Sequence, residues 1–292
     1  MPGEILVGTA SWSDPEFIRD WYPKSVPARQ RLAWYAERFP AVEVNSSFYG
    51  IPEVSTTRGW AEQTPERFQF TIKLFKGLSF HSAELKMLPE DVRHLALGPE
   101  RRVEITPQLQ AALIEKTREA LAPLADAGKL GAVLLQLSPE FSPRKHRLDE
   151  LMPLVEGLAD LQLAIELRNR NWMTTDIATA VVDWYEENAV AFVNVDAPRA
   201  EHFTIMPPSQ LVTTDRLAYM RLHGRNPVAY LTGKTVAERF DYKYSTEEIQ
   251  ETVEESRRLA QEAKRVFTIY NNNHSSYAPD AAEEFQRLSG LT

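Results

Sequence analysis

The sequence contains no cysteine. Without thiols, the chain cannot form disulfides, use a thiolate nucleophile, or hold zinc or an iron–sulfur cluster through cysteine ligands. It also lacks a run that approaches the roughly 20 apolar residues of a membrane-spanning helix. The N-terminus has no basic segment followed by a long apolar one, as a secretion signal requires. We therefore expect a cytoplasmic protein with no membrane partner.

Positive charge is scarce as well. The chain has 33 lysines and arginines against 41 aspartates and glutamates, a formal net charge of -8. Sequence-independent binding of a phosphate backbone requires a basic surface, so nucleic acid is not an expected partner. A local basic pocket for one small anion is compatible with this charge. The hydrophobic fraction of 43% is that of a globular protein rather than a disordered one.

Familiar cofactor and catalytic motifs are missing from the sequence. It has neither the G-x-G-x-x-G nor the G-x-x-x-x-G-K-[ST] pattern, so no common nucleotide-binding loop is predicted and the cofactor is left open. It also lacks the G-x-S-x-G turn of many hydrolases and the H-E-x-x-H pattern of zinc proteases. Any chemistry must therefore come from residues that are distant in the sequence.

What the sequence does contain is a regular alternation of short β-rich runs and helical stretches. The eight β-rich runs are 5–11, 42–48, 68–74, 132–137, 163–168, 190–196, 217–223 and 266–271. The helical candidates are 27–39, 55–63, 107–127, 144–159, 176–188, 199–204, 245–264 and 279–289. Parallel strands need crossover connections, so this order predicts an α/β protein with a parallel sheet. Eight units in fewer than 300 residues predict a single (β/α)₈ TIM-type barrel.

We expect one domain over residues 1–292, because a split near 128–131 would leave an incomplete sheet in each half. Two connections, 75–106 after the third run and 224–244 after the seventh, are too long for simple crossovers. Both follow strand ends, where barrel enzymes place lids and binding loops. Three helix starts carry local signals: Thr106-Pro107, the Ser245 to Glu248 capping box, and Thr174-Thr175-Asp176 as a cap before Ile177.

Polar side chains recur on one face of the later half of most β-rich runs. Side chains alternate between the two faces of a strand, and a barrel accommodates polar groups at the upper end of its interior. In run 163–168, for example, Glu166 and Arg168 share one face while Ile165 and Leu167 share the other. We therefore predict a polar pocket at the C-terminal ends of the strands.

The predicted pocket combines acids, bases and amides. Glu43 and Glu166 are candidate acid/base groups, and His223 and His81 are candidate proton carriers. The candidate substrate-binding residues are Asn45, Tyr49, Lys73, Gln136, Arg168, Trp172, Asp196, Arg221, Asn271 and Asn272. Arginine pairs well with carboxylate or phosphate, so the expected ligand is a small anionic or polyhydroxylated molecule. A divalent metal is a less favoured alternative, because the neighbouring lysine and arginines oppose a bare cation site, and no metal ligands are assigned.

These segments also resemble the YecE-like family, a domain of unknown function known as DUF72. The matching segments are 7–12, 21–23, 42–49, 70–73 with His81, 134–137, 165–168 with Trp172, 221–224, and 271–272 before Ala278. They follow one another along nearly the whole chain. The resemblance implies a TIM-type barrel and implies no particular activity.

Three functions are consistent with these observations. We favour an enzyme that applies acid–base chemistry to a small anionic or polyhydroxylated substrate, in which hydrolase, lyase and isomerase are not distinguishable. A non-catalytic metabolite-binding protein would need the same pocket without proton-transfer geometry. A metal-dependent nucleic-acid processing enzyme is the third alternative, and the net charge of -8 counts against it. The sequence leaves the oligomeric state open.

Overall fold

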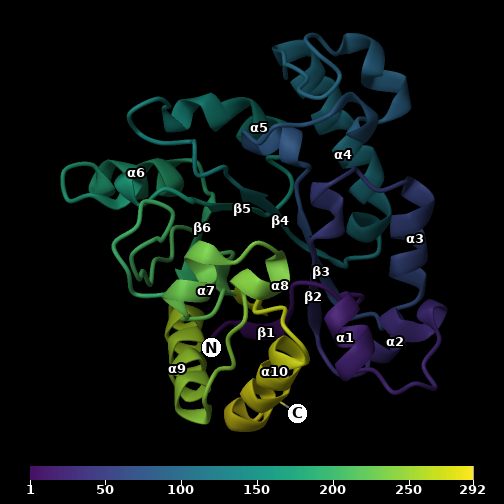
Figure 1. The fold of residues 1–292 in the computed structure, drawn as a ribbon, viewed down its shortest axis with the longest axis vertical. Coiled ribbons are helices and arrows are strands. Elements are labelled where there is room, and N and C mark those ends of the chain that lie inside the picture. The colour runs from purple at the N-terminus through teal and green to yellow at the C-terminus, as the bar shows by residue number, and fades with distance from the viewer. Residues whose placement is uncertain (292) are drawn as a thin grey trace.

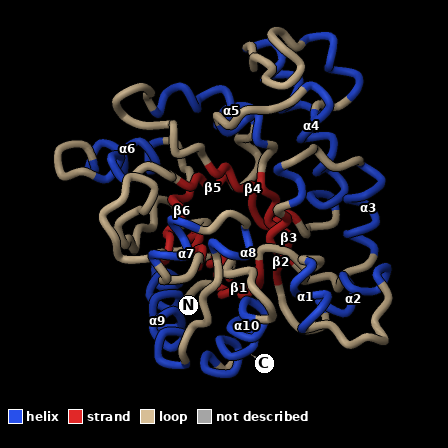
Figure 2. Tube along the Cα trace, viewed as in Figure 1, coloured by secondary structure: helices blue, strands red, loops and turns tan. Residues whose placement is uncertain are grey.

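A computed structural model of the protein describes residues 1–291, without the side chain of Val236. Thr292, the last residue of the expected domain, lies outside the described residues. Within them, eight parallel strands close a barrel in chain order, from β1 beside β2 around to β8 beside β1 (Figures 1 and 2). The strands are β1 Glu4–Thr9, β2 Ala41–Val44, β3 Gln69–Lys73, β4 Leu130–Gln136, β5 Leu163–Glu166, β6 Ala191–Asp196, β7 Ala218–Leu222 and β8 Arg265–Tyr270. The predicted (β/α)₈ barrel is confirmed.

Helices surround the ring of strands, as Figure 1 shows. The α-helices of the described chain are α1 Pro15–Asp20, α2 Arg31–Ala36, α3 Val54–Glu62, α4 Pro107–Asp126, α5 Met152–Gly157, α6 Ala178–Glu187, α7 Pro227–Thr232, α8 Val236–Arg239, α9 Thr246–Glu262 and α10 Tyr277–Ser289. Most of them lie outside the barrel, and their apolar faces pack against the outer faces of the strands. The short helices α7 and α8 instead lie across one end of the barrel (Figures 1 and 2).

The first and last strands close the barrel. β1 and β8 pair in parallel from Glu4 opposite Arg265 to Thr9 opposite Tyr270. Because all eight strands run the same way, their C-terminal ends meet at one rim. Side chains that follow the strands in the sequence therefore gather at that rim.

Apolar residues fill the barrel interior below the rim. They form a cluster separate from the layer between strands and helices, and its larger members are Leu6, Leu134, Tyr219, Phe267 and Ile269. Small alanines of β2, β4, β5 and β6 complete this cluster, so the lower barrel is a packed core rather than a channel. Packed apolar side chains therefore lie beneath the polar groups at the rim.

Two of the three predicted helix starts are confirmed, whereas α6 follows Ile177 at its start without a side-chain cap from Thr174, Thr175 or Asp176. Thr106 accepts a hydrogen bond from the backbone of Leu109, and Pro107 occupies the first turn of α4. Ser245 and Glu248 form the reciprocal bonds of a capping box at the start of α9. These side chains satisfy backbone N–H groups that have no partner within the helix.

The connections after β3 and β7 are long, as expected, and each contains short helical turns. The helix predicted at 199–204 is wrong, because the chain between β6 and β7 is irregular there. Side chains hold this connection in place of a helix. Asn194 bonds both backbone groups of Leu211, and Thr213 bonds the backbone of Val190 and Phe192.

No helix in the part of the chain that the structure describes combines the length and the apolarity needed to cross a bilayer.

Candidate functional site

Five strands contribute polar side chains to the barrel rim. Glu43 on β2, Lys73 on β3, Gln136 on β4, Glu166 on β5 and Arg221 on β7 are joined by hydrogen bonds across the interior. The alternation along each strand brings them to the inner face, as predicted. The structure therefore gathers these five residues at one site.

Arg221 lies at the centre of this site and is fully buried. Its Nε and Nη2 donate to the two carboxylate oxygens of Glu43 at 2.9 and 2.6 Å, and the Tyr219 hydroxyl donates to Glu43 at 2.8 Å. Its Nη1 donates to Glu166 and to Gln136 Oε1, the latter at 2.9 Å. A buried charge is costly unless it is paired and hydrogen-bonded. Two carboxylates compensate for the burial of Arg221, and each of its three nitrogens is engaged.

Arg168 also contacts the carboxylate of Glu166. Arg168 Nη1 donates to Glu166 Oε1 at 3.1 Å, and Nη2 donates to the Tyr230 hydroxyl at 2.8 Å. Burial by itself would raise the pKa of Glu166, but the positive charges of Arg221 and Arg168 outweigh it and hold that pKa well below the usual range. Glu166 is therefore ionised at neutral pH and is not a proton donor in this arrangement.

Lys73 has a different environment from the two arginines. Its Nζ donates to Gln136 Oε1 at 3.2 Å and lies 4.2 Å from the centre of the Phe48 ring. Burial, helped by the charge of Arg221, lowers the pKa of Lys73 to about 7. The amine is thus divided between its charged and neutral forms near neutral pH.

A chain of amides fixes the state of His223. Asn45 Nδ2 donates to the backbone oxygen of Ala10 at 3.0 Å and lies 3.4 Å from Asn271 Oδ1, which orients both amides. Asn271 Nδ2 then faces His223 Nδ1 at 2.8 Å, so Nδ1 is the acceptor and the ring hydrogen is on Nε2. Burial lowers the pKa of His223 to about 4, although Glu166 opposes the shift. His223 is therefore neutral at pH 7 and presents an N–H.

The Nε2 hydrogen of His223 is buried and, within residues 1–291, unpaired. Nε2 lies 3.4 Å from Glu166 Oε1 but has no hydrogen-bond partner among the described residues, and His223 is 1% exposed.

Gly224 follows His223 with a φ of +86°, and a Cβ there would lie 2.5 Å from Tyr242. Only glycine fits this turn, which leads the chain away from the rim directly after His223.

The connection after β7 covers the rim. The Tyr230 hydroxyl of α7 receives the hydrogen bond from Arg168, and the ring of Phe240 stacks on His223 at a centroid distance of 5.4 Å. In Figure 2 the two short helices of this segment lie in front of the strands. The connection therefore contacts both Arg168 and His223.

His81 lies beside this site rather than within its hydrogen-bond network. Its Nδ1 lies 2.9 Å from Ser79 Oγ, and its ring packs edge-on against Phe48. Burial and the nearby charge of Lys73 lower the pKa of His81 to about 4. His81 also lines a cavity of about 490 Å³ within the connection after β3.

The expected position of Asp196 is wrong. The inner face of β6 is formed by Ala191, Val193 and Val195, so Asp196 projects from the outer face. There it accepts hydrogen bonds from Arg225 and Tyr244. Run 190–196 has small or β-branched residues on one face and mixed residues on the other, and the alternation alone does not show which face is inside.

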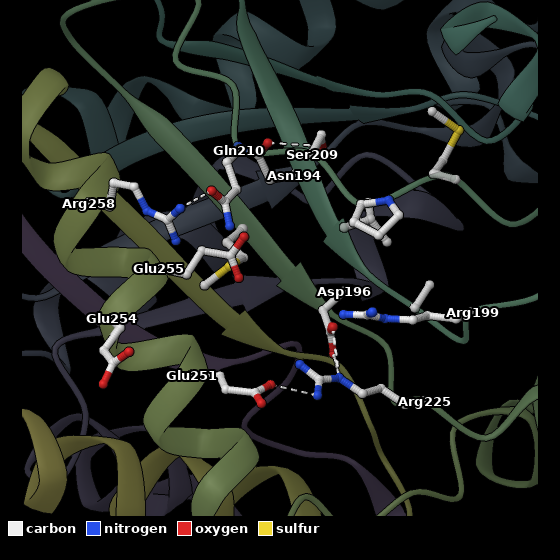
Figure 3. Close-up of a pocket in the computed structure, with 15 residues that line it drawn as sticks. Asn194, Asp196, Arg199, Ser209, Gln210, Arg225, Glu251, Glu254, Glu255 and Arg258 are labelled. Atoms are coloured by element: carbon white, nitrogen blue, oxygen red, sulfur yellow. Dashed lines mark hydrogen bonds and ion pairs between the residues drawn. The ribbon is translucent and has the colours of Figure 1, made fainter.

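A separate cavity of about 290 Å³ lies beside Asp196, between β6 and helix α9 (Figure 3). Arg225 joins Asp196 to Glu251 across one end of it. Arg258 and Gln210 are hydrogen-bonded at the other end. Arg225 and Arg258 thus already have partners within the cavity wall.

Three other predicted residues lie apart from the Arg221 network. Tyr49 is 59% exposed at the surface. Trp172 is buried, where it donates to the backbone of Phe141 and stacks on that ring. Asn272 is buried and donates to the backbone of Tyr242. The first is solvated, and the other two hold loops in place.

The prediction also missed residues that contact the site. Tyr219 shares the alternation of Arg221 and could have been found from it. Tyr230 and Phe240 fall in the connection that was expected to bind ligand, but no spacing distinguishes them from its other aromatic residues. Within residues 1–291, no three or more histidine, aspartate or glutamate side chains form a group that could hold a metal ion.

Known proteins share both the sequence pattern and the fold of this chain. A family model described as "Protein of unknown function DUF72" matches residues 6–292. The UPF0759 protein YunF of Bacillus subtilis (strain 168) is 26% identical over 288 residues, covering 97% of this chain and 94% of YunF.

Solved structures agree with this match. A DUF72 family protein of Enterococcus faecalis V583 superimposes with a TM-score of 0.81 at 28% identity, covering 99% of this chain and 96% of that one. A DUF72 family protein of Thermotoga maritima MSB8 shares the fold, with a TM-score of 0.78 at 23% identity and 98% coverage of each chain. The chain therefore belongs to the DUF72 family, which its motifs resemble.

Proposed function

We propose that this protein is an enzyme that binds a small anionic, hydroxyl-bearing molecule at the barrel rim and moves a proton on it. The observation that carries this proposal is an imbalance in the buried charges. Arg221 and its two carboxylates satisfy one another, whereas Lys73, Arg168 and His223 keep unused hydrogen-bonding capacity at the same place. Perturbed titratable groups converging in one buried site are typical of catalytic centres.

Arg168 is the group best suited to hold the anion. The structure gives its guanidinium two hydrogen bonds, and a guanidinium has five N–H donors. Arg221 has less to offer a ligand, because each of its nitrogens already donates within the network. We assign Arg221 and Glu43 a positioning role and Arg168 the binding role.

Lys73 and His223 supply the remaining chemistry in this proposal. A Lys73 amine with a pKa of about 7 can accept and return a proton near neutral pH. Neutral His223 can donate its Nε2 hydrogen to a substrate oxygen without itself changing charge. Glu166 orients both Arg168 and Arg221 as a permanent anion.

The proposal is tested by anion binding, using inorganic phosphate and malonate in calorimetric titrations. We expect Arg168→Gln to weaken binding by about tenfold or more. The matched control is Arg199→Gln, which removes an exposed arginine beside the outer cavity and should leave binding unchanged. Equal affinities in the Arg168→Gln variant and the unmodified protein would contradict the assignment.

Binding should also depend on pH in a defined direction. Lys73 is charged below its pKa of about 7 and neutral above it, so anions should bind more tightly at about pH 6 than at about pH 8. A panel of small carboxylated and phosphorylated polyols then tests turnover. Tight binding without turnover across that panel would support the non-catalytic metabolite-binding alternative.

A further inference from the structure

Lys73 is a buried cation of the barrel interior, and the groups that its amine contacts are uncharged. Its Nζ reaches the Gln136 amide oxygen and the face of the Phe48 ring, and among residues 1–291 no carboxylate lies within 4 Å of it. Arg221, by contrast, contacts two carboxylates. Lys73 is only 9% exposed, so water compensates little for the missing counter-ion.

The neighbouring carboxylates are held away from Lys73 by their own partners. Both oxygens of Glu43 accept from Arg221, and Tyr219 adds a third bond. Glu166 accepts from Arg221 at one oxygen and from Arg168 at the other. Moving either carboxylate toward Lys73 would unpair the buried Arg221, which is strongly unfavourable.

The result is an amine that carries a free electron pair under ordinary conditions. Burial and the charge of Arg221 lower the pKa of Lys73 to about 7. Desolvation and a nearby cation are the two devices that activate lysine as a nucleophile. The Gln136 oxygen accepts a hydrogen from the nitrogen and so orients it without taking its lone pair.

We propose that Lys73 forms an imine with a small aldehyde or ketone that also carries a carboxylate or phosphate group. The inference rests on the proposed function, because Arg168 would hold the anionic group of the same molecule. Lys73 and Arg168 are linked through Gln136, Arg221 and Glu166 by successive contacts across the rim. A compact oxo acid or a sugar phosphate carries both a carbonyl and an anionic group.

The reaction balances without a redox partner. The neutral nitrogen attacks the carbonyl carbon, a C–N bond forms, and the C=O π pair moves to oxygen, which takes up a proton. Loss of that oxygen as water then forms the C=N bond. The two hydrogens that leave the nitrogen are balanced by those of the water released.

Glyoxylate, an aldehyde with one carboxylate, is a suitable probe of the full chain. Protein incubated with glyoxylate and cyanoborohydride at about pH 7 should acquire one carboxymethyl group, which peptide mass spectrometry should locate on Lys73. Because exposed lysines have a pKa near 10.4, we expect Lys73 to react at least about tenfold faster than exposed Lys24. Lys129 is the buried control. It directly precedes β4, at the opposite end of the barrel, and its amine donates to the backbone of Ala61 and Thr64.

Two further measurements make the outcome decisive. The selectivity for Lys73 should largely disappear at about pH 10, where a sizeable fraction of exposed amines is also neutral, and phosphate should slow the modification by occupying Arg168. Lys73→Arg, which retains a positive charge but has no amine, should lose the rapid adduct. If Lys73 reacts no faster than Lys24 while anions still bind through Arg168, the imine is wrong and the proposed function stands. Loss of anion binding as well would contradict both the imine and the proposed function.

Discussion

Arg221, Glu43 and Glu166 form a buried arrangement in which each charge depends on the others. Arg221 and both carboxylates have side chains that are at most 1% exposed. Removing one partner leaves an uncompensated charge in a low-dielectric interior, and this is far more costly than losing an ion pair at the surface. The network therefore links the stability of the barrel rim to the integrity of the site.

The first prediction concerns Arg221→Leu. We expect the free energy of unfolding in urea to fall by about 3–5 kcal/mol, because two buried carboxylates lose their counter-ion. Lys264→Met serves as the control, since its ion pair with Asp215 is exposed and should contribute little. A change in the Arg221→Leu variant as small as that of the control would show that water solvates the rim.

The second prediction concerns the pH dependence of stability through His223. Its pKa is lowered by burial from 6.5 to about 4, so between these pH values the unfolded chain binds a proton that the folded chain does not. The contribution of His223 to stability is therefore complete above about pH 6.5 and is lost as the pH falls toward 4. His223→Gln should show a shallower loss of unfolding free energy over that window in urea titrations. Parallel curves for the two proteins would mean that His223 is protonated in the fold.

At this scale, the sequence predicted the central residues of the site but not all of them. Alternation placed Glu43, Lys73, Glu166 and Arg221 on the inner face, because an apolar partner face identified the outside in each run. It failed for Asp196, where both faces of the run could be buried. Tyr230 acts from a loop, and no periodicity relates a loop residue to a strand.

Individual helices and strands show how far local signals determine the elements. All eight strands were predicted because buried parallel strands read as compact apolar runs. Helices α1, α7 and α8 were missed, since segments of four to six residues are too short to show a 3.6-residue period. The opposite error at 199–204 has the same cause, because so short a segment cannot be distinguished from a loop that side chains hold in place.

The third prediction concerns the start of α9. Ser245 accepts from the backbone of Glu248, and the Glu248 side chain accepts from the backbone of Ser245. Ser245→Ala should lower the free energy of unfolding by about 1 kcal/mol, because one backbone N–H loses its acceptor. Denaturant unfolding followed by circular dichroism measures the change. Ser245→Asn, which retains a capping oxygen, should restore most of it, and an unchanged alanine variant would show that water replaces the cap.

The molecule as a whole is acidic, and its barrel is closed and is covered at one end by the connection after β7. Its net charge of -8 opposes nucleic acid at long range, whatever the local charge of the rim. β1 and β8 are the two ends of the chain's sheet and pair over six residues, so closure depends on the most distant parts of the sequence. Closure could be predicted from the number of strands, whereas the position of the cover could not.

The fourth prediction tests the nucleic-acid alternative. Labelled duplex DNA and single-stranded RNA should show no change in fluorescence anisotropy when the protein is added at low salt, because the acidic surface repels phosphates. A basic DNA-binding protein of similar size provides the positive control. Binding that weakens steeply with added salt would overturn the expectation and revive that alternative.

The segment that carries Tyr230 and Phe240 has a consequence for the time course of binding. Arg168 donates to Tyr230, and Phe240 lies on His223, so the proposed ligand would reach these groups only after both contacts separate. Association of the proposed ligand would then be limited by the opening of this segment rather than by diffusion, and a bound molecule would leave no faster than the segment reopens. Tyr230→Phe, which removes the hydrogen bond to Arg168, would raise the association and dissociation rate constants together and leave the dissociation constant nearly unchanged.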